Sequence, residues 1–244
     1  MSRDRLKIIL LELCWGFGKP KSQFQNRVRL FSRSAIGIAI AYLVFLINPQ
    51  VVFSHSLTHQ NYTIHSDHPL PAETFDVLKR ADRLLQESEI FSRNDHHHIF
   101  LCNGPGWFRT FNPRGSDRLY ATSHATGNIF IANGDPATDM AWKTSGTNII
   151  RSLSGLIAHE VTHNLVRDHL GVLPQWRLPA WKNEGYAEYI SIHGQKEYEL
   201  AIAKDLPRTV KPNSIHPVYQ GHLTRVLMGI GESTNRFEAL MRAD

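Results

Sequence analysis

The chain has 244 residues, of which 42% are hydrophobic and 20% charged, a composition typical of a folded protein rather than a disordered one. Its net charge of +5 is concentrated in residues 1–33, which carry eight basic and two acidic side chains, whereas residues 34–244 carry 19 basic and 20 acidic ones. Because most of the chain is nearly neutral, the charge argues against a nucleic-acid partner.

An uncharged apolar run follows the basic segment. It extends over residues 34–47, is interrupted by Asn48, Pro49 and Gln50, and resumes through Phe53. A membrane-spanning helix needs about 20 residues, which the run reaches when it is counted through Phe53. We therefore predict a transmembrane helix over residues 34–54.

The charges around this span predict its orientation. Basic residues precede it, so residues 1–33 are expected in the cytoplasm and residues 55–244 on the periplasmic or extracellular side of a single-pass membrane protein. Two readings stay open: an uncleaved signal anchor, or a signal peptide that is cut near Ser54.

The first half of residues 55–244 has mainly strand patterns. Residues 61–65 predict a strand, and apolar residues at three- to four-residue spacing predict a helix over residues 72–89. A short buried strand is expected at residues 98–102, followed by an irregular loop over residues 107–118.

Two more strands are predicted at residues 119–122 and 128–133, and a helix over residues 148–168 that Gly171 ends. The order, a mixed β-sheet half followed by a helical half, indicates an α+β domain. The strand at residues 128–133 either lies at the edge of the sheet, where it could pair with an extended substrate, or is an internal strand.

The predicted helix over residues 148–168 contains the sequence His159-Glu160-Val161-Thr162-His163. Residues four apart lie on one face of a helix, so both imidazoles can reach one cation. Glu160 lies beside them, where it can take a proton from a metal-bound water. The helix is otherwise apolar, which disfavours an accidental pair of polar histidines.

A third ligand is available downstream, in the segment Trp181-Lys182-Asn183-Glu184-Gly185-Tyr186-Ala187-Glu188-Tyr189. Glu184 and Glu188 are again four residues apart on one face of a helix that Pro179 suits as an entrance. One carboxylate can bind the metal while the other holds a ligating histidine by its free N–H.

HEVTH followed by WKNEGYAEY resembles the gluzincin group of zinc metallopeptidases, in the peptidase MA-like superfamily. The resemblance is specific over residues 156–191, and the twenty residues between His163 and Glu184 are slightly more than in its best-known branches. It implies a zincin-like fold, Zn²⁺ held by His159, His163 and Glu184, and Glu188 as the carboxylate behind a ligating histidine.

The resemblance also implies a reaction, hydrolysis of peptide bonds in a peptide or protein substrate. Glu160 would be the general base, and a Tyr or His would stabilise the oxyanion. Tyr219 is the candidate that we select for this last role, with His222, Tyr186 and Tyr189 as alternatives.

Two other functions remain open: a catalytically inactive zinc-binding protein of the same type that acts in binding or assembly at the membrane, and a membrane-tethered interaction module. The intact Glu160 counts against the first, since a structural metal needs no general base. A further histidine-rich segment, Asp95-His96-His97-His98, is interpreted as a polar turn because no spaced partner ligand is evident in the sequence.

Overall fold

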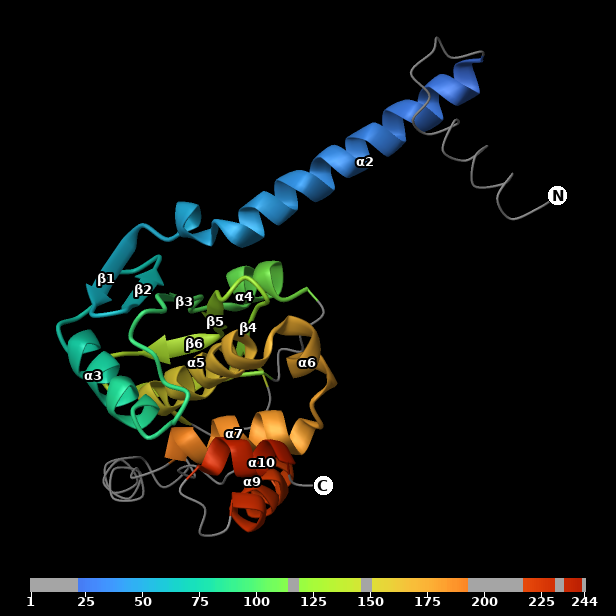
Figure 1. The fold of residues 1–244 in the computed structure, drawn as a ribbon. Coiled ribbons are helices and arrows are strands. Elements are labelled where there is room, and N and C mark those ends of the chain that lie inside the picture. The colour runs from blue at the N-terminus through green and yellow to red at the C-terminus, as the bar shows by residue number, and fades with distance from the viewer. Residues whose placement is uncertain (1–21, 114–118, 146–150, 193–216, 231–234, 243–244) are drawn as a thin grey trace. The chain divides into compact units, whose positions relative to one another are not determined.

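A computed structural model describes residues 22–113, 119–145, 151–192, 217–230 and 235–242. The chain divides into two compact units, Met1–Pro49 and Gln50–Asp244 (Figure 1). Each is described by itself.

In the first unit, helix α2 (Gln23–Ile47) begins at Ser22, whose side chain accepts a hydrogen bond from the Gln25 amide. Its 25 residues measure about 37 Å along the axis, so it is long and apolar enough to cross a membrane. The helix starts before residue 34 because it includes the last part of the basic segment, from Gln23 onward. It ends before Pro49, since proline has no N–H to donate the next helical hydrogen bond.

The transmembrane helix was predicted to extend through residue 54, but in the structure the helix ends at Ile47. Pro49–Val52 form a 3₁₀ turn, η1. Phe53 is buried in the second unit, with its ring 5.1 Å from that of Phe100 and 6.0 Å from that of Phe111.

The second unit contains a five-stranded mixed sheet with the strand order β1-β2-β3-β5-β4 among the described residues. β2, β3 and β5 are parallel, and β1 and β4 pair antiparallel at the two edges. The strands are β1 (His55–His59), β2 (Tyr62–Ser66), β3 (His97–Leu101), β4 (Ala121–Ser123) and β5 (Ile129–Ile131). The strands predicted at residues 61–65, 98–102, 119–122 and 128–133 correspond to the last four.

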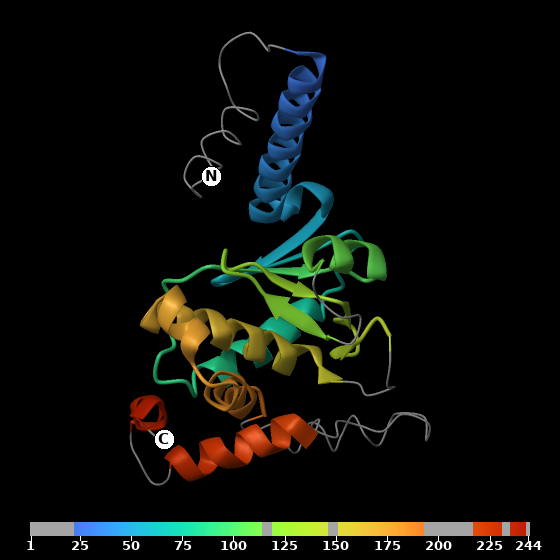
Figure 2. The same cartoon turned by 90° about the vertical axis from the view of Figure 1, so that its right-hand side faces the viewer.

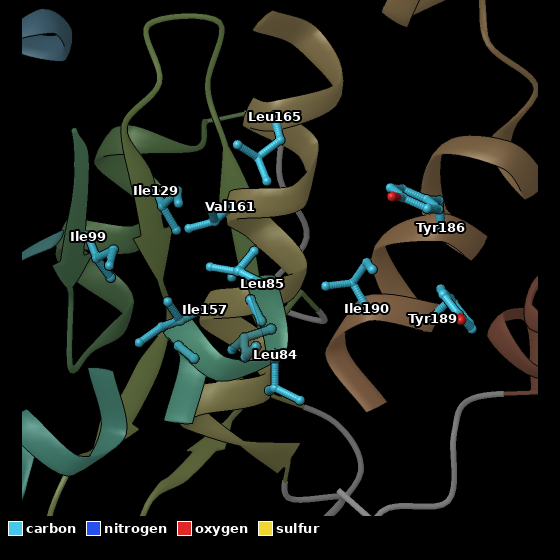
Figure 3. Packing of buried hydrophobic residues seen from close by; sticks show 14 of the residues in the cluster. Leu84, Leu85, Ile99, Ile129, Ile157, Val161, Leu165, Tyr186, Tyr189 and Ile190 are labelled. Carbon is cyan, nitrogen blue, oxygen red and sulfur yellow. The ribbon is translucent and has the colours of Figure 1, made fainter. Parts of the chain in front are cut away.

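One face of this sheet packs against helices α3 (Thr74–Leu85) and α5 (Leu153–Leu170). Alternation along the strands sends Ile99 and Ile129 to this face, where they meet Leu85, Ile157 and Val161 (Figure 3). Burying each such side chain stabilises the fold by about 1.5–3 kcal/mol. This packing holds the helix that carries HEVTH against the sheet.

The opposite face of the sheet is covered in part by helix α4 (Pro105–Phe111). Phe111 stacks on Phe130 of β5, with ring centroids 4.5 Å apart. An irregular loop was predicted from residue 107, so the prediction is wrong over this helix. Gly104 followed by Pro105 is the start signal, since proline suits the first helical position.

A second, three-stranded sheet joins β6 (Asn133–Asp135), β7 (Met140–Trp142) and β8 (Arg151–Ser152) and leads into α5. Buried Asp139 anchors the start of that helix. Its carboxylate accepts hydrogen bonds from the Ser154 amide (2.7 Å) and hydroxyl (2.8 Å), and it pairs with Arg80 of α3 at 3.0 Å.

The remaining described helices are α6 (Val172–Arg177), α7 (Ala180–Ile192), α9 (Pro217–Ile230) and α10 (Arg236–Arg242). Gly171, with φ of 89°, ends α5 as predicted. Figure 2 shows the sheet, then α5, α7 and α9 as successive layers of the second unit. The fold is thus α+β with a mixed sheet, preceded by one apolar helix.

Candidate metal centre

Helix α5 positions His159 and His163 one turn apart on its buried face. The helix is capped by the Ser152 hydroxyl, which accepts a hydrogen bond from the Gly155 amide at 3.2 Å. His159 and His163 are only 4% and 8% exposed. Their Nε2 atoms lie 3.3 Å apart, so both lone pairs can be directed at a single point.

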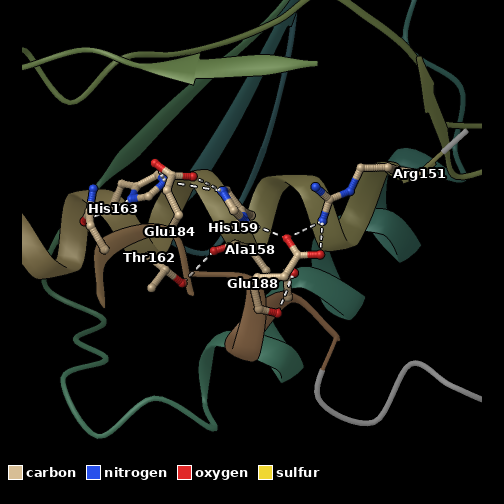
Figure 4. Close-up of polar contacts among 9 residues, drawn as sticks. Arg151, Ala158, His159, Thr162, His163, Glu184 and Glu188 are labelled. Atoms are coloured by element: carbon tan, nitrogen blue, oxygen red, sulfur yellow. Dashed lines mark hydrogen bonds and ion pairs between the residues drawn. The ribbon is translucent and has the colours of Figure 1, made fainter. Parts of the chain in front are cut away.

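Helix α7 brings Glu184 to the same point (Figure 4). One oxygen of its carboxylate lies 3.5 Å from His159 Nε2, and the other lies 3.6 Å from His163 Nε2. Tetrahedral ligands about 2.1 Å from an ion lie about 3.4 Å from one another. The three residues therefore present donor atoms at about the spacing of ligands that share one ion, and the group could hold a metal ion.

Glu188, one turn further along α7, lies behind this cluster. Its Oε2 atom is 3.2 Å from His159 Nδ1, the nitrogen that points away from Glu184. Arg151 Nη2 donates to both carboxylate oxygens of Glu188, at 2.9 and 2.7 Å (Figure 4). Glu188 is thus placed to orient the imidazole of His159.

His163 is oriented in the same way by a different residue. Its Nδ1 atom lies 3.3 Å from the side-chain oxygen of Asn183, which precedes Glu184 on α7. Each imidazole therefore has an acceptor at Nδ1, which leaves Nε2 for the metal. No role was predicted for Asn183 or Arg151. For Asn183 the available signal was its place in Asn-Glu-Gly, next to the predicted ligand.

The charges in this cluster shift the pKa values of its members. Burial by itself lowers the pKa of His159, but its hydrogen bonds to Glu184 and Glu188 raise it to about 9. Burial would raise the pKa of both carboxyls; the two histidines hold that of Glu184 well below its usual range, and Arg151 with His159 lowers that of Glu188 to about 2. The metal-free cluster therefore holds a proton at neutral pH, which a bound metal has to displace.

Glu160 follows His159 on α5 and is 7% exposed. Burial raises the pKa of its carboxyl above the usual range, and the neighbouring histidines oppose this rise. Its side chain lines the same cavity as the three donor residues, so it can exchange a proton with a molecule bound there.

The cavity at the cluster has a volume of about 510 Å³. Its walls come from the edge strand β4, from α5, and from α6 and the start of α7. The lining residues are Leu119, Ala121, Thr122, Ser123, His159, Glu160, His163, Gln175, Trp176, Leu178, Ala180, Asn183 and Glu184. The strand at residues 128–133 is internal, since β5 lies between β3 and β4, so the edge strand beside the cluster is β4.

None of the four candidates for stabilising an oxyanion is among the described residues that line this cavity. Tyr186 is buried and its hydroxyl lies 3.0 Å from that of Ser88, while the Tyr189 hydroxyl accepts from Arg236 at 2.8 Å. His222 lies on α9. Tyr219 is in the first turn of the same helix, and its side chain lies outside the described residues.

Comparison of the chain with protein-family models, with curated proteins and with solved structures gives no match. Its function therefore has to be inferred from the donor atoms, their orientation and the cavity that they border.

Proposed function

We propose that the chain is a zinc-dependent metallopeptidase with His159, His163 and Glu184 as ligands and Glu160 as general base. The observation that carries this proposal is the convergence of three donor residues at an open cavity whose wall includes Glu160: the two histidine Nε2 atoms lie 3.3 Å apart, and each lies 3.5–3.6 Å from one carboxylate oxygen of Glu184. A purely structural metal site has no need of an open cavity or of an ionisable group beside it.

Zinc is favoured by the donor set. Two imidazoles and one carboxylate are a common ligand set of catalytic zinc, with the fourth position left for water or substrate. When bound, zinc supplies Lewis acidity, which lowers the pKa of water to ~7 and polarises a carbonyl group.

Glu160 would move the proton in this reaction. It would take the proton from the attacking water as the C–O bond forms, and pass it to the nitrogen of the leaving amine in the later step in which the peptide C–N bond breaks. The raised pKa of its carboxyl brings it closer to working pH, where a base can both accept and return a proton.

Strand β4 is the part of the cavity wall that suits an extended peptide. Among the strands that the structure describes, β4 pairs with β5 on one side only, which leaves its other edge as the place where a further strand could add. Ala121, Thr122 and Ser123 of this strand line the cavity. We infer that a substrate peptide adds to this edge as a further strand and so lies across the metal cluster.

The resemblance of HEVTH and NEGYAE to the gluzincins supports a zincin-like fold for the second unit. For the first unit, we propose that α2 spans a membrane once, with the basic N-terminus in the cytoplasm and residues 55–244 on the periplasmic or extracellular side.

The test is peptide cleavage by the full chain in detergent, assayed by mass spectrometry on a peptide library with zinc-loaded protein. Glu160→Gln should bind zinc as wild type does but lose at least about 100-fold in kcat/KM, because an amide cannot accept the proton. Glu73→Gln, an exposed glutamate, is the matched control. Zinc-loaded wild type that cleaves no peptide would indicate instead the non-catalytic zinc-binding protein.

A further inference from the structure

The turn between strands β4 and β5 is attached to the helix that carries the two histidines. Within this turn the Gly127 amide donates to the His124 carbonyl at 2.9 Å, and the His124 amide donates to the Asn128 carbonyl at 2.9 Å. Gly127 has φ of 88°, which glycine adopts without strain. The turn comes directly after Ser123, which is the last residue of β4 and part of the cavity wall.

Two side chains of α5 donate to the carbonyl groups of this turn. Asn164 Nδ2 donates to the Gly127 carbonyl at 2.8 Å, and Arg167 Nη1 donates to the His124 carbonyl at 3.1 Å. Arg167 Nη1 also donates to Asn164 Oδ1 at 2.9 Å, so each side chain holds the other in place. Asp168 accepts a further hydrogen bond from Arg167 Nε at 2.9 Å. We call Asn164 and Arg167 the hairpin clamp.

The hairpin clamp fixes the end of β4 against α5 in one arrangement. Asn164 is 1% exposed, and its amide nitrogen and oxygen both have partners. Apolar packing between β5 and α5 is non-directional, whereas these hydrogen bonds need particular distances and angles. Asn164 directly follows His163, and Arg167 lies one turn further along α5. A shift of this end of β4 relative to His163 therefore breaks buried hydrogen bonds, which is costly.

We propose that Asn164 and Arg167 are positioning residues, which set where a peptide paired with β4 lies relative to His159, His163 and Glu184. The inference rests on the proposed function, in which a substrate adds to the edge of β4 as a further strand. The position of such a peptide follows that of the strand with which it pairs. A displacement of about 1 Å at the reacting atoms lowers a rate by as much as ~100-fold. The hairpin clamp therefore matters for a peptide that pairs with β4, and little for one too short to do so.

The dependence of cleavage on peptide length separates this role from a general effect on stability. Two nested peptides are compared on the zinc-loaded full chain in detergent, a short one and one extended to span the three residues of β4. Both are chosen from a library for binding to zinc-loaded Glu160→Gln. In wild type, kcat/KM should be higher for the longer peptide. Arg167→Met should lower kcat/KM about 10-fold for the longer peptide, the effect of one or two lost hydrogen bonds, and less than about twofold for the short one.

Three further variants complete this comparison. Asn164→Leu removes the other half of the hairpin clamp and should act as Arg167→Met does. Arg167→Lys keeps a donor for the His124 carbonyl and should restore most of the loss. Arg80→Met, which breaks an ion pair with a buried carboxylate on another part of the fold, is the matched control and should keep the wild-type dependence on length. A lower folded fraction would reduce cleavage of both peptides equally.

Binding of the two peptides to zinc-loaded Glu160→Gln gives a measure that does not need cleavage. Adding Arg167→Met should weaken binding of the longer peptide about 10-fold and leave the zinc content unchanged. Equal losses for both peptides, or no loss, would overturn the proposal. If wild type cleaves neither peptide but the longer one binds and Arg167→Met weakens that binding, the peptidase proposal fails and the positioning role stands. If neither peptide is cleaved or bound, both proposals fail.

Discussion

Arg151 is expected to support both the stability of the fold and the affinity for zinc, through Glu188. The carboxylate of Glu188 is 1% exposed and takes both hydrogen bonds, of 2.7 and 2.9 Å, from one nitrogen of Arg151. Arg151→Met leaves this buried carboxylate with His159 as its remaining cationic neighbour. Breaking such a pair from one side costs about 3–5 kcal/mol, and the 11% exposure of Arg151 favours the lower end.

The effect on zinc follows from the contact of Glu188 with His159 Nδ1. Without Arg151, Glu188 has a raised pKa and binds a proton more readily, so it orients the imidazole less firmly. Loss of such supporting contacts weakens metal affinity by about 10–100-fold. The assays are urea unfolding of the metal-free full chain and zinc competition with a chromophoric chelator at pH 7.

Arg80→Met is the matched control, because Arg80 likewise pairs with a buried carboxylate, that of Asp139 at 3.0 Å, and lies on α3 rather than on the helices that carry the cluster. It should lower the free energy of unfolding but leave the zinc dissociation constant within about twofold of wild type, since distant sites act independently. If both variants bind zinc equally well, Arg151 acts only on stability and the reasoning is refuted.

Three further outcomes are expected. Gly185→Ala should destabilise the protein by about 1–3 kcal/mol in urea unfolding, because a Cβ there would lie 2.6 Å from Val226 and 2.9 Å from the His222 carbonyl. Gly221→Ala, with nothing within 4 Å, should be neutral or stabilising. Since the pKa of His159 is about 9 without metal, zinc binding at pH 7 should release about one proton. The affinity of the protein for zinc should therefore fall as the pH decreases below 9. Equal heats of zinc binding in buffers of different ionisation enthalpy would contradict this proton release. Cys102 is buried with a raised pKa, so iodoacetamide should label it only after denaturation.

The elements with a clear hydrophobic period could be predicted from the sequence. The helices α3 and α5 have apolar residues at three- to four-residue spacing, and β2 and β3 are short segments with β-branched and aromatic residues and turn residues beside them. The helix α4 was missed because aromatic, Gly and Asn residues are weak helix formers, and its stability comes from Phe108 and Phe111 packing under the sheet.

The order in which strands pair depends on residues far apart in the sequence, so it could not be predicted from the local pattern of any one strand. Nothing within residues 128–133 shows that β5 is flanked by β3 and β4, and strands of three residues are too short for a period. For the same reason the contact of Arg151 with Glu188 was not predicted, because the two residues lie 37 positions apart in the sequence. By contrast, the pairing of His159 with His163 on one face of α5, and of Glu184 with Glu188 on one face of α7, was predictable from helical spacing, whereas the choice of Glu184 as the third donor came from the resemblance to the gluzincins.

Bound zinc per chain tests the central proposal most directly, in full-length wild type, Glu184→Ala and Glu188→Ala at saturating zinc. The proposal predicts that Glu184→Ala holds one zinc ion fewer than wild type. It predicts that Glu188→Ala still fills the site, with a weaker dissociation constant. Wild type and Glu184→Ala with the same zinc content, or a folded wild type that takes up no zinc, would contradict a catalytic metal at His159, His163 and Glu184.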